Sequence, residues 1–146
     1  MNLSEALILE HHQIDEGIEQ YVATGDIEPL RTAFEALRRH IYLEEEFLFP
    51  PIRAAGLLMP ILVMIREHGA LWQRMDAIDS ALADGHDTAG DCRELLARLD
   101  DHNSKEEPIV YPHVDSDLSP EQAAGLDRFL QEGTLPDDWI CEALRA

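Results

Sequence analysis

Hydrophobic side chains recur along this chain at intervals of three, four and seven residues, the spacing that places them on one face of an α-helix. Proline and glycine divide the pattern into four long segments, which predict helices over about residues 4–24, 29–50, 60–84 and 87–111. Ser4 is the expected N-cap of the first helix and Gly25 its end, while Pro50 and Pro51 should end or kink the second helix. Four long amphipathic segments with short connections favour an all-α, up-down-up-down four-helix bundle.

The rest of the chain predicts a smaller helical part. At 146 residues the chain fits one domain, and we expect the bundle in residues 1–115 and a C-terminal helical extension in residues 116–146. Ser119 with Pro120 predicts the start of a short helix, and residues 136–144 predict one or two further turns. The extension is expected either to cover the bundle or to contact a second copy of the chain.

Histidine and glutamate residues interrupt the hydrophobic faces of all four predicted helices. On the first helix His11 takes the inward position between Leu7 and Ile14, whereas His12 falls on the polar face and is the less favoured candidate. The inward residues of the other helices are His40, Glu44, His68, His102 and Glu106. From the helical rise of about 1.5 Å per residue, the two histidines of the first hairpin both lie roughly 16 to 20 Å from its turn, and those of the second match each other likewise. All six side chains should therefore meet in one layer.

Six such groups in one layer differ from a single buried histidine. One histidine on an apolar face is most often a hydrogen-bonded core residue. Four imidazoles and two carboxylates, with no inward Lys or Arg to pair them, would carry a severe desolvation cost that bound cations remove. Imidazole nitrogen with carboxylate oxygen and no thiolate suits iron, manganese or zinc, and two bridging carboxylates would hold two ions about 3.5 to 4 Å apart. The layer therefore predicts a metal centre.

The candidate ligands belong to an internal repeat. Residues 40–50 align without gaps on residues 102–112, and both segments read His-x-x-x-Glu-Glu with an aromatic residue before a proline. The lone histidine upstream repeats as well, and a glutamate precedes it in both copies. The chain thus contains two copies of one helical hairpin, over about residues 3–55 and 59–112. The second glutamate of each motif either supports the ligands or lies on the solvated surface; these residues are Glu45 and Glu107.

On these residues the sequence resembles the hemerythrin-like, cation-binding HHE family over about residues 3–112. The doubled His-x-x-x-Glu-Glu followed by an aromatic residue and proline carries the resemblance. It implies a four-helix bundle around a non-haem di-iron centre with an oxo or hydroxo bridge, and manganese or zinc is the less favoured occupant. The ligands that it implies are His11, His40, His68 and His102 at the ends of the centre, and Glu44 and Glu106 as bridges.

The departures from the family pattern narrow the expected function. Trp72 stands one turn after His68, where oxygen-carrying hemerythrins have a fifth histidine, so the chain is more similar to members with four His and two Glu. These include bacterial iron-centre repair proteins, whose cysteine-bearing N-terminal domain this sequence lacks. We expect a protein that binds or reacts with dioxygen, nitric oxide or hydrogen peroxide, in stress response or iron-centre maintenance, and leave open whether it is an enzyme.

Two other functions remain as alternatives. One is a non-catalytic iron store, donor or sensor that acts through a protein partner or as a homodimer, and the other is a purely structural metal bundle. Ferritin-like oxidases and zinc peptidases are disfavoured, because the sequence contains neither Glu-x-x-His nor His-Glu-x-x-His. Elemental analysis would separate the structural case, in which zinc replaces iron.

Charge excludes further classes of partner. With 30 acidic against 11 basic residues the net charge is -19, which argues against nucleic acid and anionic membrane surfaces as partners. No apolar stretch reaches membrane length, and the first ten residues lack a basic leader with a sustained apolar run. We therefore expect a cytoplasmic protein.

Overall fold

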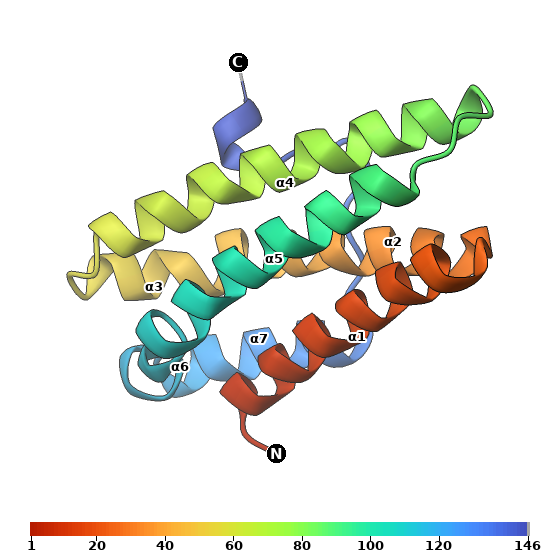
Figure 1. Ribbon diagram of the computed structural model, residues 1–146. Coiled ribbons are helices and arrows are strands. Elements are labelled where there is room, and N and C mark those ends of the chain that lie inside the picture. Colours follow the sequence, from red (N-terminus) through yellow and green to blue (C-terminus); the bar gives the residue numbers. More distant parts are fainter. Residues whose placement is uncertain (146) are drawn as a thin grey trace.

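Four long helices lie side by side, and each runs in the direction opposite to the one before it, the up-down-up-down topology (Figure 1). In a computed structural model, which describes residues 1–145, they are α1 (Leu3–Thr24), α2 (Ile27–Leu43), α4 (Met59–Ala83) and α5 (Ala89–Ile109). Gly25 ends α1 in the left-handed conformation, with φ of 77°, and the Asp26 side chain then caps α2. The predicted all-α four-helix bundle is confirmed.

The first helix begins earlier than predicted. Asn2, and not Ser4, is its N-cap: the Asn2 side chain accepts a hydrogen bond from the Glu5 N–H at 2.8 Å. The Glu5 carboxylate in turn accepts one from the Asn2 N–H at 3.2 Å. Asn2 wins because only it has a glutamate three residues later to complete the capping box, and Ser4 lies inside the first turn.

The prolines after α2 do not end the helical run. A π-helical turn, η1 (Glu44–Leu48), joins α2 to a short helix, α3 (Phe49–Ala54), in which Pro50 and Pro51 take the first turn. Pro lacks the N–H that an α-helix needs but is tolerated where that donor is unpaired, at a helix start. The π-helical turn, a wide turn because its hydrogen bonds span five residues, begins at Glu44 and ends at Leu48, so the prolines lie in the first turn of the helix that follows it.

The second hairpin repeats this wide turn at Glu106. The N–H groups of Val110 and Tyr111 both donate to the Glu106 carbonyl, at 2.8 and 3.1 Å. A turn closed by a hydrogen bond over five residues contains one residue more than an α-helical turn, so the residues after it face the interior one position later than regular spacing predicts. Regular helical spacing after His102 and Glu106 predicts that Ile109 lies on that face, which is wrong: Ile109 is 46% exposed and Val110 is fully buried. In both hairpins a wide turn thus follows the His-x-x-x-Glu motif.

The C-terminal part folds back over its own bundle (Figure 1). It comprises α6 (Pro112–Asp117), α7 (Pro120–Glu132) and a 3₁₀ turn, η2 (Glu142–Leu144). Ser119 caps α7 as predicted, and α7 lies against α2 and η1. The 3₁₀ turn lies against α4 at Gly69, where a Cβ atom would stand 2.8 Å from the Cβ of Ala143. His113 lies in α6 and pairs with Asp117 at 2.7 Å.

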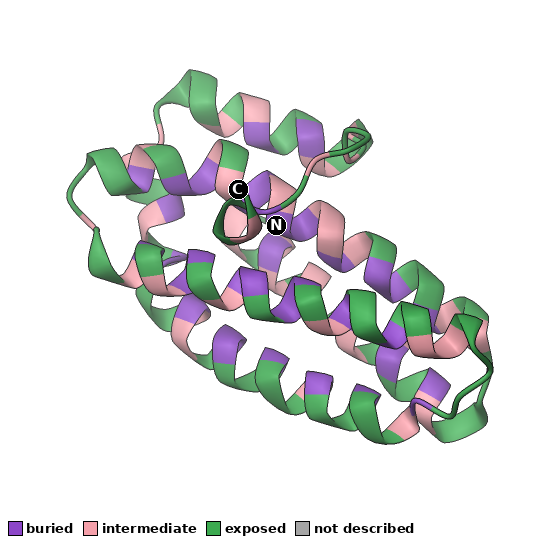
Figure 2. Cartoon of the chain, turned by 90° about the horizontal axis from the view of Figure 1, so that it is seen from above, coloured by how far each residue is buried: buried purple, intermediate pink, exposed green. Residues whose placement is uncertain are grey.

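Figure 2 shows that the buried residues of the helices face the inside of the bundle. Two hydrophobic clusters lie there. The first, which includes Phe34 and Met75, occupies the end where the hairpins turn. The second, which includes Leu7, Ile52 and Leu126, occupies the other end and reaches α7. The polar layer lies between them. No helix in residues 1–145 has both the length and the apolar character of a membrane span.

Candidate metal centre

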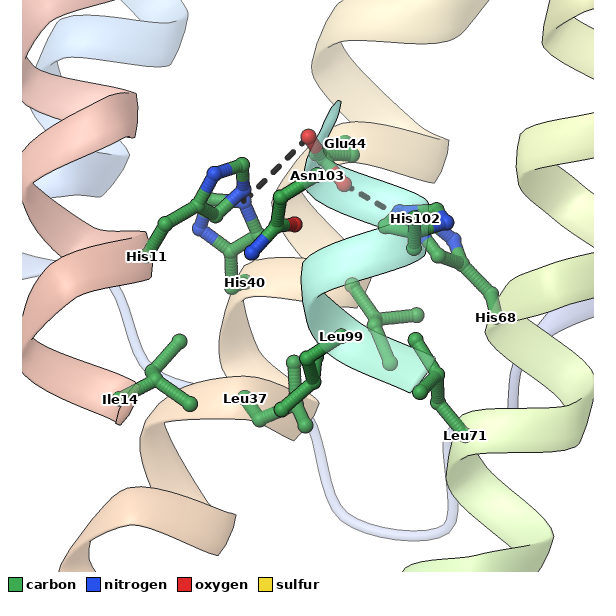
Figure 3. A pocket seen from close by; sticks show the side chains of 11 residues that line it. His11, Ile14, Leu37, His40, Glu44, His68, Leu71, Leu99, His102 and Asn103 are labelled. Atoms are coloured by element: carbon green, nitrogen blue, oxygen red, sulfur yellow. Dashed lines mark hydrogen bonds and ion pairs between the residues drawn. The ribbon is translucent and has the colours of Figure 1, made fainter. Parts of the chain in front are cut away.

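Four buried histidines, one from each long helix, converge in this layer (Figure 3). The side chains of His11, His40, His68 and His102 are at most 4% exposed. The Nε2 atoms of His11 and His40 are 3.1 Å apart, and the rings of the other pair have centroids 5.2 Å apart. His12 is exposed on the outer face of α1, so His11 is the histidine that lies in the layer.

Glu44 and Glu106 are fully buried, and each carboxylate lies between the two histidine pairs. Glu44 has Oε2 at 3.3 Å from the Nε2 of His40 and Oε1 at 3.1 Å from that of His68. Glu106 has Oε1 at 3.2 Å from the Nε2 of His11 and Oε2 at 3.4 Å from that of His102. The six residues therefore form two adjoining groups, each with two imidazoles and one oxygen of each carboxylate, whose ligand atoms lie within 4.8 Å of one another.

A second set of carboxylates holds the outer nitrogen of every histidine in the layer. The pairs, all at 2.7 to 2.8 Å from Nδ1, are His11 with Glu107, His40 with Glu10, His68 with Glu45 and His102 with Glu67. An imidazole that donates its Nδ1–H to a carboxylate turns the Nε2 lone pair toward the interior. All four Nε2 atoms then point into the layer as electron-pair donors.

Sequence reasoning foresaw part of this outer set. It left Glu45 and Glu107 open between surface and support, and the structure places both on a histidine. It gave no role to Glu10 and Glu67, although each stands directly before a candidate histidine in both copies of the repeat. That repetition was the available signal. Each of these two contacts the histidine of the neighbouring helix rather than its own neighbour in sequence.

The charges in the layer call for a cation. Glu44 Oε1 and both oxygens of Glu106 accept no hydrogen bond, although an imidazole nitrogen stands close to each. Burial alone would lower the pKa of His102, but Glu106 and Glu67 raise it to about 10. Burial likewise raises the pKa of Glu106, but His102 and His11 bring it well below its ordinary value. Protons balance the charge when no metal is bound, and a cation would take their place.

Tyr111 adds a group that sequence reasoning did not assign. Its buried hydroxyl donates to Glu44 Oε2 at 2.7 Å and lies 2.9 and 3.1 Å from the Nε2 atoms of His11 and His40. Phe49 occupies the same position of the repeat in the first hairpin. The two rings stack alike, Tyr111 on His11 with centroids 5.4 Å apart and Phe49 on His68 at 5.5 Å.

A small cavity of about 10 Å³, the space of about one water molecule, lies against the four histidines. Four apolar side chains, one turn away from the histidines, form its floor (Figure 3): Ile14, Leu37, Leu71 and Leu99. The amide of Asn103, nine-tenths buried, also lines it. A larger groove of about 340 Å³ runs between α4 and α5 and borders Leu71 and His102, which line the small cavity too.

Comparison with known proteins agrees with this architecture. The family model of the hemerythrin HHE cation binding domain matches residues 2–114. No curated protein and no solved structure matches the chain. The matched range contains both copies of the hairpin and every residue of the polar layer. The chain belongs to the hemerythrin HHE family, and its bundle is a cation-binding domain.

Proposed function

We propose that this hemerythrin HHE protein holds two iron ions and that the di-iron centre binds or reacts with a small ligand: dioxygen, nitric oxide or hydrogen peroxide. The proposed ligands are His11 and His40 for one ion, His68 and His102 for the other, and Glu44 and Glu106 as bridges. The observation that carries the proposal is the pair of adjoining donor groups that share both carboxylates. We place such reactivity in stress response or in the maintenance of iron centres.

Two ions account for the layer better than one. Each carboxylate has one oxygen beside each histidine pair, the arrangement of a bridge between ions about 3.5 to 4 Å apart. A single ion would leave two imidazole lone pairs and two carboxylate oxygens buried without a partner, at a severe desolvation cost. Nitrogen and oxygen donors without thiolate suit iron, which supplies redox chemistry and ligand exchange when it is bound.

The surroundings of the layer favour a small and neutral ligand. The cavity of about 10 Å³ excludes anything much larger than a diatomic molecule or a peroxide. Its floor is apolar, which disfavours ions, and the Asn103 amide can donate one hydrogen bond to a bound molecule. The outer carboxylates keep the histidines in place during ligand exchange, because each fixes the Nδ1 proton and the ring orientation.

Metal analysis and spectroscopy test this proposal. The protein is loaded with ferrous iron under anaerobic conditions, its iron content is measured, and optical spectra are recorded before and after addition of each ligand. We expect two irons per chain and a spectral change with at least one ligand. His11→Ala should lose iron, while the matched control His12→Ala should keep it. Stoichiometric zinc in place of iron, or indifference to all three ligands, would contradict the proposal.

A second candidate function is an iron sensor that acts through a protein partner. The contact that favours it joins the C-terminal part to a histidine of the layer: the Glu142 N–H donates to Glu45 Oε1 at 2.8 Å, and Glu45 Oε2 accepts from His68. A change at His68 can therefore be transmitted to the terminal turn. Limited proteolysis with and without iron tests it. A cleavage rate after residue 132 that depends on iron supports sensing, and equal rates contradict it.

A further inference from the structure

We infer that Tyr111 is a further ligand of the ion between His11 and His40, so that exogenous molecules bind the other ion. This inference rests on the proposed di-iron centre. It assigns a binding role to a residue outside the His and Glu set, and it distinguishes two ions that the repeat alone would make equivalent. Three observations carry it: the position of the Tyr111 oxygen, the residue that replaces it in the other hairpin, and the location of the groove.

The Tyr111 oxygen stands where a ligand atom would stand. Atoms that bind one ion at about 2.1 Å and at right angles lie about 3 Å from each other. The Tyr111 oxygen is 2.9 Å from the His11 Nε2 and 3.1 Å from the His40 Nε2, and those nitrogens are 3.1 Å apart. The three atoms thus form a nearly equilateral triangle, the shape of one face of an octahedron.

A bound cation would turn these hydrogen-bonded groups into ligands. The Tyr111 hydroxyl donates its proton to Glu44 Oε2, and its oxygen lies within hydrogen-bond distance of the Nε2 atoms of His11 and His40. Without metal, imidazole protons can bridge these contacts. When a cation takes the place of those protons, the two nitrogens and the Tyr111 oxygen all face it as electron-pair donors, and its charge favours the phenolate over the phenol.

The ion between His68 and His102 has no such oxygen beside it. Phe49 stacks on His68 as Tyr111 stacks on His11, but its ring has no donor atom. With the oxo or hydroxo bridge expected of the proposed di-iron centre, two histidines and two carboxylate oxygens bring each ion to five ligands. Tyr111 completes six for the first ion, whereas the ion beside Phe49 keeps one position for an exogenous molecule.

The route from solvent leads to the same ion. The groove between α4 and α5 borders His102, which together with His68 would hold the ion beside Phe49. The groove between α1 and α2, lined by Gln13, Gly17 and Ala33 among others, borders none of the six proposed ligands. A molecule that enters from solvent along the groove between α4 and α5 therefore reaches the ion held by His68 and His102 before the other ion.

Vibrational and optical spectra of the ferric protein test the assignment of Tyr111. A phenolate bound to ferric iron gives a visible charge-transfer band, and excitation into that band enhances phenolate ring modes in the resonance Raman spectrum. We expect both signals in the full-length, iron-loaded protein. Tyr111→Phe should abolish them while two irons per chain remain. The control Tyr21→Phe, which removes another buried hydroxyl, bonded to Thr88 at 2.8 Å, should leave both signals unchanged.

Nitric oxide, a neutral diatomic molecule, tests the second part of the inference on the ferrous protein. We expect one nitric oxide per chain in the original protein, two in Tyr111→Phe, and none in Phe49→Tyr, which supplies a phenol to the second ion. Two irons with nitric oxide binding but no phenolate signal would overturn the role of Tyr111 and leave the proposed function standing. Absence of bound iron would overturn both. The Raman spectrum of the unmodified protein decides the matter even where a variant fails to fold.

Discussion

The two halves of the polar layer are built on one plan but have different surroundings. In each half a lone histidine and the His-x-x-x-Glu motif of one hairpin supply the inner donors, and an aromatic ring from the other hairpin stacks on the lone histidine. The difference is a hydroxyl, present on Tyr111 and absent from Phe49. Duplication of a hairpin thus accounts for two similar ion sites, and substitution at their edges accounts for what makes each site distinct.

A second difference lies one turn beyond the lone histidine. Asp15 occupies this position in the first half and Trp72 in the second. Trp72 is buried and contacts Trp139 of the C-terminal segment, with ring centroids 5.7 Å apart. Asp15 is partly buried, and its Oδ1 has no hydrogen-bond partner in residues 1–145. The second half is therefore covered by the C-terminal segment at a place where the first half carries a charge.

Substitution of a bridging carboxylate should damage both ion sites, and we expect it to have the largest effect on iron content. Glu106→Gln replaces a charged oxygen donor to both ions with a neutral amide, so we expect iron content to fall from two per chain to less than one. Elemental analysis after gel filtration measures it. Glu35→Gln on the exposed face of α2 is the matched control and should keep two irons. Retention of both irons in Glu106→Gln would exclude the bridging role.

Removal of one histidine from each half in turn should show how the two ion sites differ in iron affinity. His40→Ala leaves its ion with His11 and the Tyr111 oxygen, whereas His102→Ala leaves the other ion with His68 alone besides the bridges. We expect the iron affinity of the damaged site to fall about tenfold further in His102→Ala, a difference of about 1.4 kcal/mol. Competition with a chelator measures both affinities. Equal losses would show that Tyr111 gives no compensation.

Substitution of an outer carboxylate should lower iron affinity, measured by the same chelator competition, by different amounts in the two halves. The Glu45 side chain is 4% exposed and accepts hydrogen bonds from both His68 and the Glu142 N–H, whereas the Glu107 side chain is 29% exposed and within residues 1–145 bonds to His11 alone. Loss of such a partner typically costs about 10- to 100-fold in metal affinity. We expect Glu45→Gln near the upper limit and Glu107→Gln near the lower one. The opposite order would mean that burial of the carboxylate does not set its contribution.

The sequence predicts the inner layer well because helical periodicity is a local property. The inward residues of α1, from Leu7 through His11 to Tyr21, are the buried ones in the structure. Ile109 fails because the wide turn at Glu106 breaks the period that the prediction assumes. Ile109 and Val110 are both β-branched and apolar and follow each other in the sequence, so spacing alone does not tell which of them faces inward after such a turn.

Contacts between helices were beyond what spacing could predict. Glu10 reaches the histidine of α2 and not its neighbour His11, and the Tyr111 hydroxyl comes to the layer only because the wide turn brings it there. Both depend on rotation of one helix against another, which a one-dimensional pattern does not contain. The repeat gave a usable signal for Glu10. For Tyr111 the signal was a difference between copies, since only one of the two aromatic positions carries a hydroxyl.

The smallest expected effect concerns Asp15, the charged counterpart of Trp72. Burial raises the pKa of Asp15 from 3.8 to about 6. The folded state therefore binds this proton more tightly than the unfolded chain does, so the charge on Asp15 costs stability above about pH 6, and the cost fades as the pH falls toward 4. Because the side chain is only partly buried, we expect Asp15→Asn to stabilise the metal-free protein by about 1 kcal/mol at neutral pH, less than the full shift implies. Urea unfolding of the metal-free protein at neutral pH and near pH 4.5 measures the gain, which should shrink in acid. Glu16→Gln, next to it on the exposed face, should show no such dependence, and a gain for Asp15→Asn that is constant with pH would mean that the charge is not its source.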